Sequence, residues 1–149
     1  MRLRKQKITP YTIFPVNLFD DYNSVMQTSV LGGGKKLVSG ICGSDDDVHV
    51  MMYHMNRKLT GDRFALIIDA ETISEVSLAL SMGDGWEWIN SNWQFVEKGT
   101  AEYLFHLTDF VDLDLSQRCK AIFILIKSSG RYEYPDKISL NIISLRLMS

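Results

Sequence analysis

The sequence predicts an all-β protein, an antiparallel β-sandwich of the jelly-roll type. Short apolar runs alternate with turn residues, which gives eight or more expected strands spaced 8–15 residues apart. One run, Glu75–Met82, alternates strictly between apolar and small or polar side chains, the period-two pattern of a strand with one buried face. No stretch keeps a 3.6-residue period long enough for a core helix. Many short strands without core helices are typical of a sandwich or barrel.

The other strands are expected where an apolar run lies between turn residues. These runs are Val48–Met55, Phe64–Asp69, Trp93–Val96, Ala101–Leu107, Ala121–Lys127 and Ile138–Leu147. Ala121–Lys127 is apolar at both parities, so we expect a central strand that is covered on both sides. Turn residues predict connections at Gly32–Gly34 and Gly40–Asp47, and a loop or one helical turn at Leu113–Ser116.

The length and composition fit one domain. The chain has 149 residues, 46% hydrophobic and 23% charged, which is enough for a full core and typical of a globular protein. We expect residues 1–15 to be an extended lead-in or linker remnant, and residues 16–149 to form a single β-sandwich domain. No apolar h-region follows the basic first residues, so we expect any secretion signal to lie outside this sequence.

The charge and the cysteines narrow the function classes. A net charge of −2 and a pI near 5.9 argue against a nucleic-acid partner, which usually requires a basic surface. No apolar run approaches the roughly 20 residues of a membrane-spanning helix, so no membrane partner is expected. Cys42 and Cys119 match neither a zinc-site spacing nor a CxxC pair. We expect two buried free thiols.

No motif predicts catalysis or metal binding. The sequence has no GxSxG motif, and its three histidines are scattered over predicted strands as His49, His54 and His106. His49 and His54 have opposite parity, so they should point to opposite faces. The acidic run Asp45–Asp47 supplies too few oxygens to ligate calcium unaided, and we expect a solvated turn. We therefore expect neither catalytic nor metal-ligating residues.

All three tryptophans, Trp86, Trp88 and Trp93, lie within eight residues in a polar segment rich in turn residues. A hydrophobic core usually spreads such large side chains over several strands, so at least one indole should face solvent as a flat apolar plate. Trp86 and Trp88 share parity, and we expect them to form this plate on one face. Trp93 follows a predicted turn, and two placements stay open for it: beside this pair as a further ligand contact, or inside the core.

Polar and aromatic residues near the expected plates fit a sugar ligand. A pyranose ring presents C–H bonds on one face, which suit an aromatic plate, and hydroxyls around its rim, which suit amide, carboxylate and guanidinium groups. Tyr132 and Tyr134 share parity in a second aromatic loop, where we expect the other wall of the site. The expected ligand-binding residues are Trp86, Trp88, Trp93, Glu87, Asn90, Tyr132, Tyr134 and Arg131.

Several segments between about Val16 and Leu147 follow one known pattern. They are an entry strand at Asn17–Asp21, the paired strands Phe64–Ile68 and Val76–Leu80, Gly83–Gly85 ahead of Trp86, and the closing strands Tyr103–Leu107, Ile122–Ile126 and Ile142–Leu147. In these segments the chain resembles the jelly-roll carbohydrate-binding modules of bacterial plant-cell-wall glycoside hydrolases.

The resemblance implies a non-catalytic domain that binds a β-linked plant cell-wall polysaccharide, such as a β-glucan (cellulose among them), a xyloglucan or a mannan. Such a module is part of a secreted, extracellular protein, in which it holds a covalently linked catalytic module on its substrate. Many of these modules carry a calcium-ligating aspartate in the closing strand, where this chain has Ile143 and Ser144. We therefore expect no cofactor, with a structural calcium as the open alternative.

Two other functions stay open at this point. One is a protein-interaction or structural β-sandwich whose aromatic residues dock a neighbouring domain. The other is a small glycosidase that uses Glu87 or Glu133 as one of a pair of carboxylates.

Overall fold

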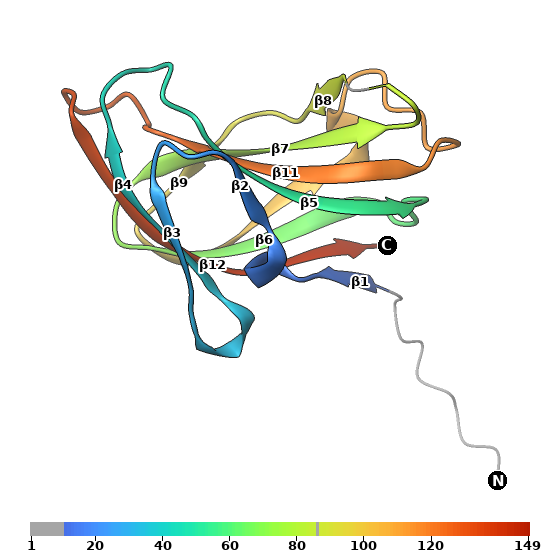
Figure 1. Cartoon of the computed structure of the whole chain (residues 1–149), viewed down its shortest axis with the longest axis horizontal. Coiled ribbons are helices and arrows are strands. Elements are labelled where there is room, and N and C mark those ends of the chain that lie inside the picture. Colours follow the sequence, from blue (N-terminus) through green and yellow to red (C-terminus); the bar gives the residue numbers. More distant parts are fainter. Residues whose placement is uncertain (1–10, 86) are drawn as a thin grey trace, which may run out of the picture.

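The computed structural model describes residues 11–85 and 87–149, and these form two antiparallel sheets packed face to face (Figure 1). The β12 sheet has the order β10 (Gly99–His106), β6 (Arg63–Ala70), β12 (Asp136–Met148), β4 (Lys36–Cys42) and β3 (Gln27–Val30), and β1 (Tyr11–Phe14) pairs with β12. The β11 sheet has the order β2 (Asp20–Asn23), β5 (His49–Arg57), β11 (Cys119–Lys127), β7 (Ser74–Met82) and β8 (Trp88–Asn90), and β9 (Gln94–Val96) pairs with β7. The predicted β-sandwich is confirmed.

The hydrophobic core lies between the two sheets. Figure 1 shows β5, β11 and β7 side by side in one layer, with β6 and β12 in the layer beneath. Alternate residues of β11 and β7 point into the core and are fully buried: Ile122, Ile124, Ile126, Val76, Leu78 and Leu80. The predicted central strand is confirmed, because β11 pairs with β5 on one side and β7 on the other.

The apolar patterning did not predict the first strands, although the family resemblance placed an entry strand at Asn17–Asp21, which overlaps β2. β2 and β3 are mostly exposed and have the polar sequences DDYN and QTSV, so they carry no apolar alternation. Residues Tyr11–Phe14 were expected in a lead-in, but they pair with β12 and the Phe14 side chain is buried. The lead-in is therefore wrong for these residues, and the rest of it, residues 1–10, lies outside the described residues.

The chain crosses from the β11 sheet to the β12 sheet between β2 and β3. At this crossing the buried Met26 donates its backbone N–H to His49 Nδ1 at 3.1 Å. The buried Lys36 ammonium donates to the Phe19 carbonyl nearby. A buried histidine and a buried lysine thus satisfy backbone groups where the chain leaves one sheet for the other.

The second face of β7 is also buried, unlike the half-exposed strand that the alternation predicts. Ser77, Ala79 and Ser81 point away from the core, yet all three are covered. The connection between β8 and β9 lies over them: Ser91 Oγ accepts from Leu78 N at 3.0 Å and lies 3.1 Å from Ser77 Oγ. The small size of the three side chains leaves room for this covering segment.

Candidate functional site

The outer face of the β11 sheet carries a second, smaller apolar cluster. Its buried members are Val50, Ala79, Ala121, Phe123 and Leu125. The strand register places Met52 and Ala79 on either side of Phe123, with Asp20 beyond Met52 and Asn90 beyond Ala79. The row therefore has an apolar centre and a polar residue at each end, which suits a ligand that is apolar on its face and polar at its rim.

Trp88 lies on this outer cluster. Its indole stacks on the Phe123 ring, with ring centroids 3.9 Å apart and planes inclined by 28°. The Tyr22 ring meets the indole edge-on at 5.2 Å. Phe123 is buried and Trp88 is half-buried, so the indole is supported from below by a fixed ring. One face of the indole is thereby occupied, and its position on the sheet is fixed before any ligand binds.

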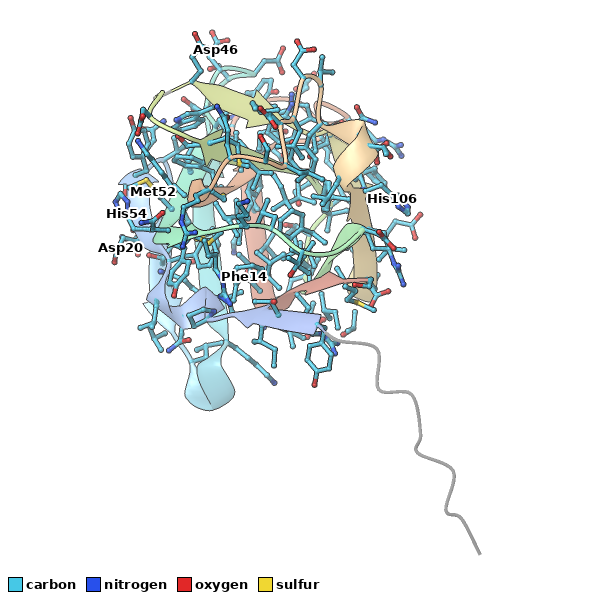
Figure 2. All side chains as sticks on the ribbon, turned by 90° about the vertical axis from the view of Figure 1, so that its right-hand side faces the viewer. Phe14, Asp20, Asp46, Met52, His54 and His106 are labelled. Atoms are coloured by element: carbon cyan, nitrogen blue, oxygen red, sulfur yellow. The ribbon has the colours of Figure 1, made fainter. Side chains whose placement is uncertain are left out.

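A pocket of about 260 Å³ opens beside Trp88. It is lined by Tyr22, Met52, His54, Ser81, Trp88, Ala121 and Phe123. Figure 2 shows Asp20, Met52 and His54 together on one side of the molecule, with His106 on the opposite side. The pocket combines aromatic and thioether surface with an exposed imidazole, which suits a small ligand with both an apolar face and hydrogen-bonding groups.

A larger pocket of about 720 Å³ shares His54 and Ala121 with the Trp88 pocket. Its other lining residues are Met55, Asn56, Gly83, Asp84, Gln117, Arg118 and Lys120. Gly83 has a φ of +62°, and the Gln117 side chain packs 3.0 Å from where a Cβ would lie. A side chain here would strain the backbone and press on Gln117, so this position at the wall of the pocket favours glycine.

A second tryptophan covers the far end of the outer face. Trp93 packs half-buried against the outer cluster, and the Lys127 ammonium lies 4.2 Å from its ring centroid. Lys127 is also 3.6 Å from a Glu75 carboxylate oxygen. Of the two placements left open for Trp93, the interior of the sandwich is wrong, because the outer side of β7 accepts the indole over small side chains. Gln94 pairs with Val76, so Trp93 lies about 13 Å along β7 from Trp88.

The second aromatic loop follows the end of β11 at Lys127. Ala121, at the level of Trp88, is about 20 Å from this end of the strand. The Arg131 guanidinium lies 3.9 Å from the Phe95 ring centroid, and Tyr132 is exposed. The Tyr134 phenol donates to the Asp45 carboxylate, and this hydrogen bond raises the pKa of Tyr134. Tyr134 therefore faces the β4–β5 loop and does not join Trp88.

The structure brings together part of the predicted site. Trp88 and Asn90 share the outer face, with Glu87 exposed between the β7–β8 turn and Trp88, while Trp86 lies outside the described residues. The sequence analysis missed the residues that other strands place beside Trp88: Tyr22, Met52, His54 and Phe123. It also missed Arg118 and Lys120, which line the neighbouring larger pocket. The parity of Ala121, Phe123 and Leu125 signals a second buried face, but only the strand order reveals which residues adjoin Trp88.

The described part of the chain contains no activated nucleophile among its cysteines. Burial raises the pKa of the Cys119 thiol to about 11, and burial also raises that of Cys42, so both are protonated at neutral pH. Both are free, and they are not paired with each other. Over residues 11–85 and 87–149, no three His, Cys, Asp or Glu side chains are grouped closely enough to hold a metal ion.

Comparisons with known proteins find similarity in structure alone. No family model and no curated protein matches the sequence. Among solved structures, a mutant of a family 29 carbohydrate-binding module matches with a TM-score of 0.62 at 13% identity, over 95% of this chain and 92% of that one. A mutant of the module CBM29-2 complexed with mannohexaose gives 0.63 and 13%, over 95% and 93%. Another, complexed with cellulohexaose, gives 0.62 and 14%, over 94% and 91%.

The chain shares their fold. The match covers nearly the whole of both chains, so the likeness extends to both sheets of the sandwich. At this level of identity it says nothing about which residues bind a ligand. Among the described residues, no helix has the length and apolar character needed to cross a membrane.

Proposed function

We propose that the chain is a non-catalytic module that binds a β-linked plant cell-wall polysaccharide on the outer face of the β11 sheet. One observation carries the proposal: Trp88 lies flat on the buried Phe123 beside a pocket of about 260 Å³. The fold adds support, because the similar modules include complexes with mannohexaose and cellulohexaose. The ligand class proposed is therefore a β-glucan, xyloglucan or mannan.

Each part of the outer face has a role in this proposal. Trp88 stacks on the C–H face of a sugar ring, and Asn90 and His54 bind hydroxyl groups at the rim. Trp93 is a second plate about 13 Å further along β7, with one face already covered by Lys127. A chain of sugar rings would then follow β7 from one tryptophan to the other. Trp86, Glu87, Arg131 and Tyr132 remain proposed peripheral contacts.

The proposal includes the setting of the module. It would be covalently linked to a catalytic module in a secreted protein and act outside the cell. Binding by the module would keep the linked enzyme near its polysaccharide and raise the effective substrate concentration. The release of reducing sugars by the purified chain would contradict the non-catalytic assignment.

The decisive test is titration of the chain with mannohexaose, cellohexaose and xyloglucan oligosaccharides. Trp88→Ala should weaken binding by roughly tenfold or more, about 1.4 kcal/mol, because the stacking surface is lost. The variant also loses ring pairs with Phe123 and Tyr22, each worth about 0.5–1.5 kcal/mol of stability, and should still fold. Circular dichroism would check folding before titration.

The matched control is Tyr11→Ala. Tyr11 is an aromatic residue with 52% exposure, but it lies on β1, at the edge of the other sheet. This variant should bind the oligosaccharides as the parent does. If no glycan binds the parent chain, the proposed function fails, and docking of a neighbouring protein becomes the better explanation of the aromatic face. Equal losses in both variants would contradict the assignment of the site to the β11 sheet.

A further inference from the structure

The larger pocket, which we call the Arg118 pocket, lies next to the stacking site. It shares His54 and Ala121 with the Trp88 pocket, so the two form one continuous depression. Trp88 pairs with Ser81 on β7, and Ser81 pairs with Ala121 on β11. Two strand spacings, about 10 Å, therefore separate the backbone of Trp88 on β8 from that of Ala121 on β11, where the Arg118 pocket begins. A short oligosaccharide that stacks on Trp88 can reach into it.

The Arg118 pocket has an excess of positive charge. Its lining includes two cations, Arg118 and Lys120, and one carboxylate, Asp84. Lys120 Nζ is 3.9 Å from Asp84 Oδ1, but the Asp84 side chain is fully exposed, and such pairs contribute little in water. The local formal charge is thus +1, although the whole chain carries −2. The charge of the pocket is therefore opposite in sign to the net charge of the chain.

Arg118 is held in place by its neighbour. Its Nε donates to Asn56 Oδ1 at 3.1 Å, and one terminal nitrogen donates to the Asn56 carbonyl at 3.3 Å. A guanidinium has five N–H donors, so these two bonds fix its plane and leave other donors for a ligand. A planar guanidinium with fixed orientation matches the two oxygens of a carboxylate.

We infer that the Arg118 pocket binds the carboxylate of a uronic acid, so that the ligand of this module is an acidic glycan. The inference rests on the proposed function, since Trp88 must hold a sugar ring next to the pocket. A local charge of +1 matches the single charge of a uronate. Arg118 supplies the paired donors, Lys120 adds a positive charge, and Gln117 and Asn56 line the remaining surface for hydroxyl groups.

The test compares acidic and neutral oligosaccharides of equal length on the parent chain by calorimetric titration. The acidic probes have β-linked backbones: oligomannuronate, the counterpart of mannohexaose, and glucuronate-substituted xylo-oligosaccharides, the counterpart of xylohexaose. The neutral probes are xylohexaose, mannohexaose and cellohexaose. We expect at least one acidic probe to bind roughly tenfold more tightly than its neutral counterpart, the size of one charge-assisted hydrogen bond. Raising the salt concentration should reduce this preference, because solvent-exposed charges are screened.

Two variants test whether the preference for the acidic probe comes from the Arg118 pocket. Arg118→Gln and Lys120→Gln should each lower the affinity for the acidic probe by severalfold to about tenfold and change that for the neutral probes by less than about twofold. Lys137→Gln is the matched control: it removes an exposed cation on β12, in the other sheet. This control should leave both affinities unchanged, while Trp88→Ala should weaken acidic and neutral binding alike.

The possible outcomes distinguish a failure of the uronate inference from a failure of the proposed function. If acidic and neutral probes bind the parent chain equally, or if both glutamine variants lose affinity for both kinds of probe equally, the uronate inference is overturned and the proposed function stands. If no glycan of either kind binds, the proposed function itself fails and the inference fails with it. A preference for the acidic probe that survives in both glutamine variants would also overturn the assignment to this pocket.

Discussion

The two faces of the β11 sheet are both buried, but by different means. On the inner face, Ile122, Ile124 and Ile126 pack against the opposite sheet, which is held by its own hydrogen-bonded strands. On the outer face, Phe123 and Leu125 are covered by a few side chains, chiefly Trp88 and Trp93. The inner face is thus covered by a continuous sheet, and the outer face by a few aromatic rings on a short segment.

This difference separates stability from recognition. A sheet can be removed only by unfolding the sandwich, so the inner face should determine the free energy of unfolding. The rings on the outer face retain partly exposed surface, since Trp88 and Trp93 are only half-buried. The outer cluster therefore supports a binding surface, because Phe123 fixes Trp88 from below and Trp88 keeps part of its surface exposed.

The largest expected effect comes from shortening an inner-face side chain. Ile124 is fully buried in the core. Ile124→Ala removes three buried carbons and leaves a cavity, so the free energy of unfolding should fall by about 2–5 kcal/mol. Urea denaturation with an unchanged m-value would measure this loss. The glycan affinity of the remaining folded protein should not change.

Ile13→Ala is the matched control for Ile124→Ala. Ile13 is 62% exposed on the edge strand β1, so its truncation should cost within about 1 kcal/mol. A folded Ile124→Ala protein that lost as much glycan affinity as Trp88→Ala would contradict the separation of the two faces.

The second largest effect is expected from Ser91→Ala, in the segment that carries Trp88 and Trp93. Ser91 is buried between β8 and β9, and its hydroxyl accepts a hydrogen bond from Leu78 N at 3.0 Å. Ser91→Ala leaves this N–H without its side-chain acceptor and should cost about 1–3 kcal/mol of stability. Because Ser91 fixes the segment between Trp88 and Trp93, glycan affinity should fall as well. Thermal unfolding and titration would measure the two losses.

The control for Ser91→Ala is Ser29→Ala, an exposed serine on β3 in the other sheet. It should change neither stability nor affinity measurably. An affinity equal to that of the parent chain in the Ser91→Ala variant would show that the covering segment positions the tryptophans without this hydrogen bond, and the proposed role of Ser91 would be wrong.

The inner face could be predicted from the sequence, and the outer face only in part. The alternation of Glu75–Met82 identifies Val76, Leu78 and Leu80 as core residues. This pattern depends only on which face of the strand is buried, and not on which strands lie beside it. The burial of Ser77 and Ala79 could not be predicted, since it depends on a segment more than ten residues later folding back over them.

In the candidate site, too, the sequence predicted neighbours on one strand but not neighbours from different strands. Trp88 and Asn90 are adjacent to each other on one short strand, so their shared face follows from parity alone. Phe123, Tyr22 and Arg118 come from β11, β2 and the loop before β11, and only the strand order β2-β5-β11-β7-β8 brings them near Trp88. Tyr132 and Tyr134 share parity too, but a hydrogen bond to Asp45 directs Tyr134 elsewhere.

The smallest effect at neutral pH is expected from His49, a buried histidine on the inner face whose pKa the fold lowers. Burial lowers the pKa of His49 below its usual value near 6.5, against the opposing influence of Asp21, whose Oδ1 lies 3.3 Å from His49 Nε2. The other charged group that acts on it is Lys36 of β4, which also lowers this pKa. His49 is therefore neutral in the folded protein at pH 7, where its Nδ1 accepts from Met26 N.

The sign of the pH dependence follows from proton binding. Between the folded and unfolded pKa values the unfolded chain binds more protons, so stability is complete above pH 6.5 and falls as the pH drops towards the folded pKa. His49→Asn, whose side-chain oxygen can accept from Met26 N without titrating, should flatten this acid loss in denaturation experiments at pH 7 and pH 5. His54→Asn, on the outer face, should retain it. A retained slope in His49→Asn would mean that carboxylates, and not the buried imidazole at the β2–β3 crossing, cause the acid sensitivity of the sandwich.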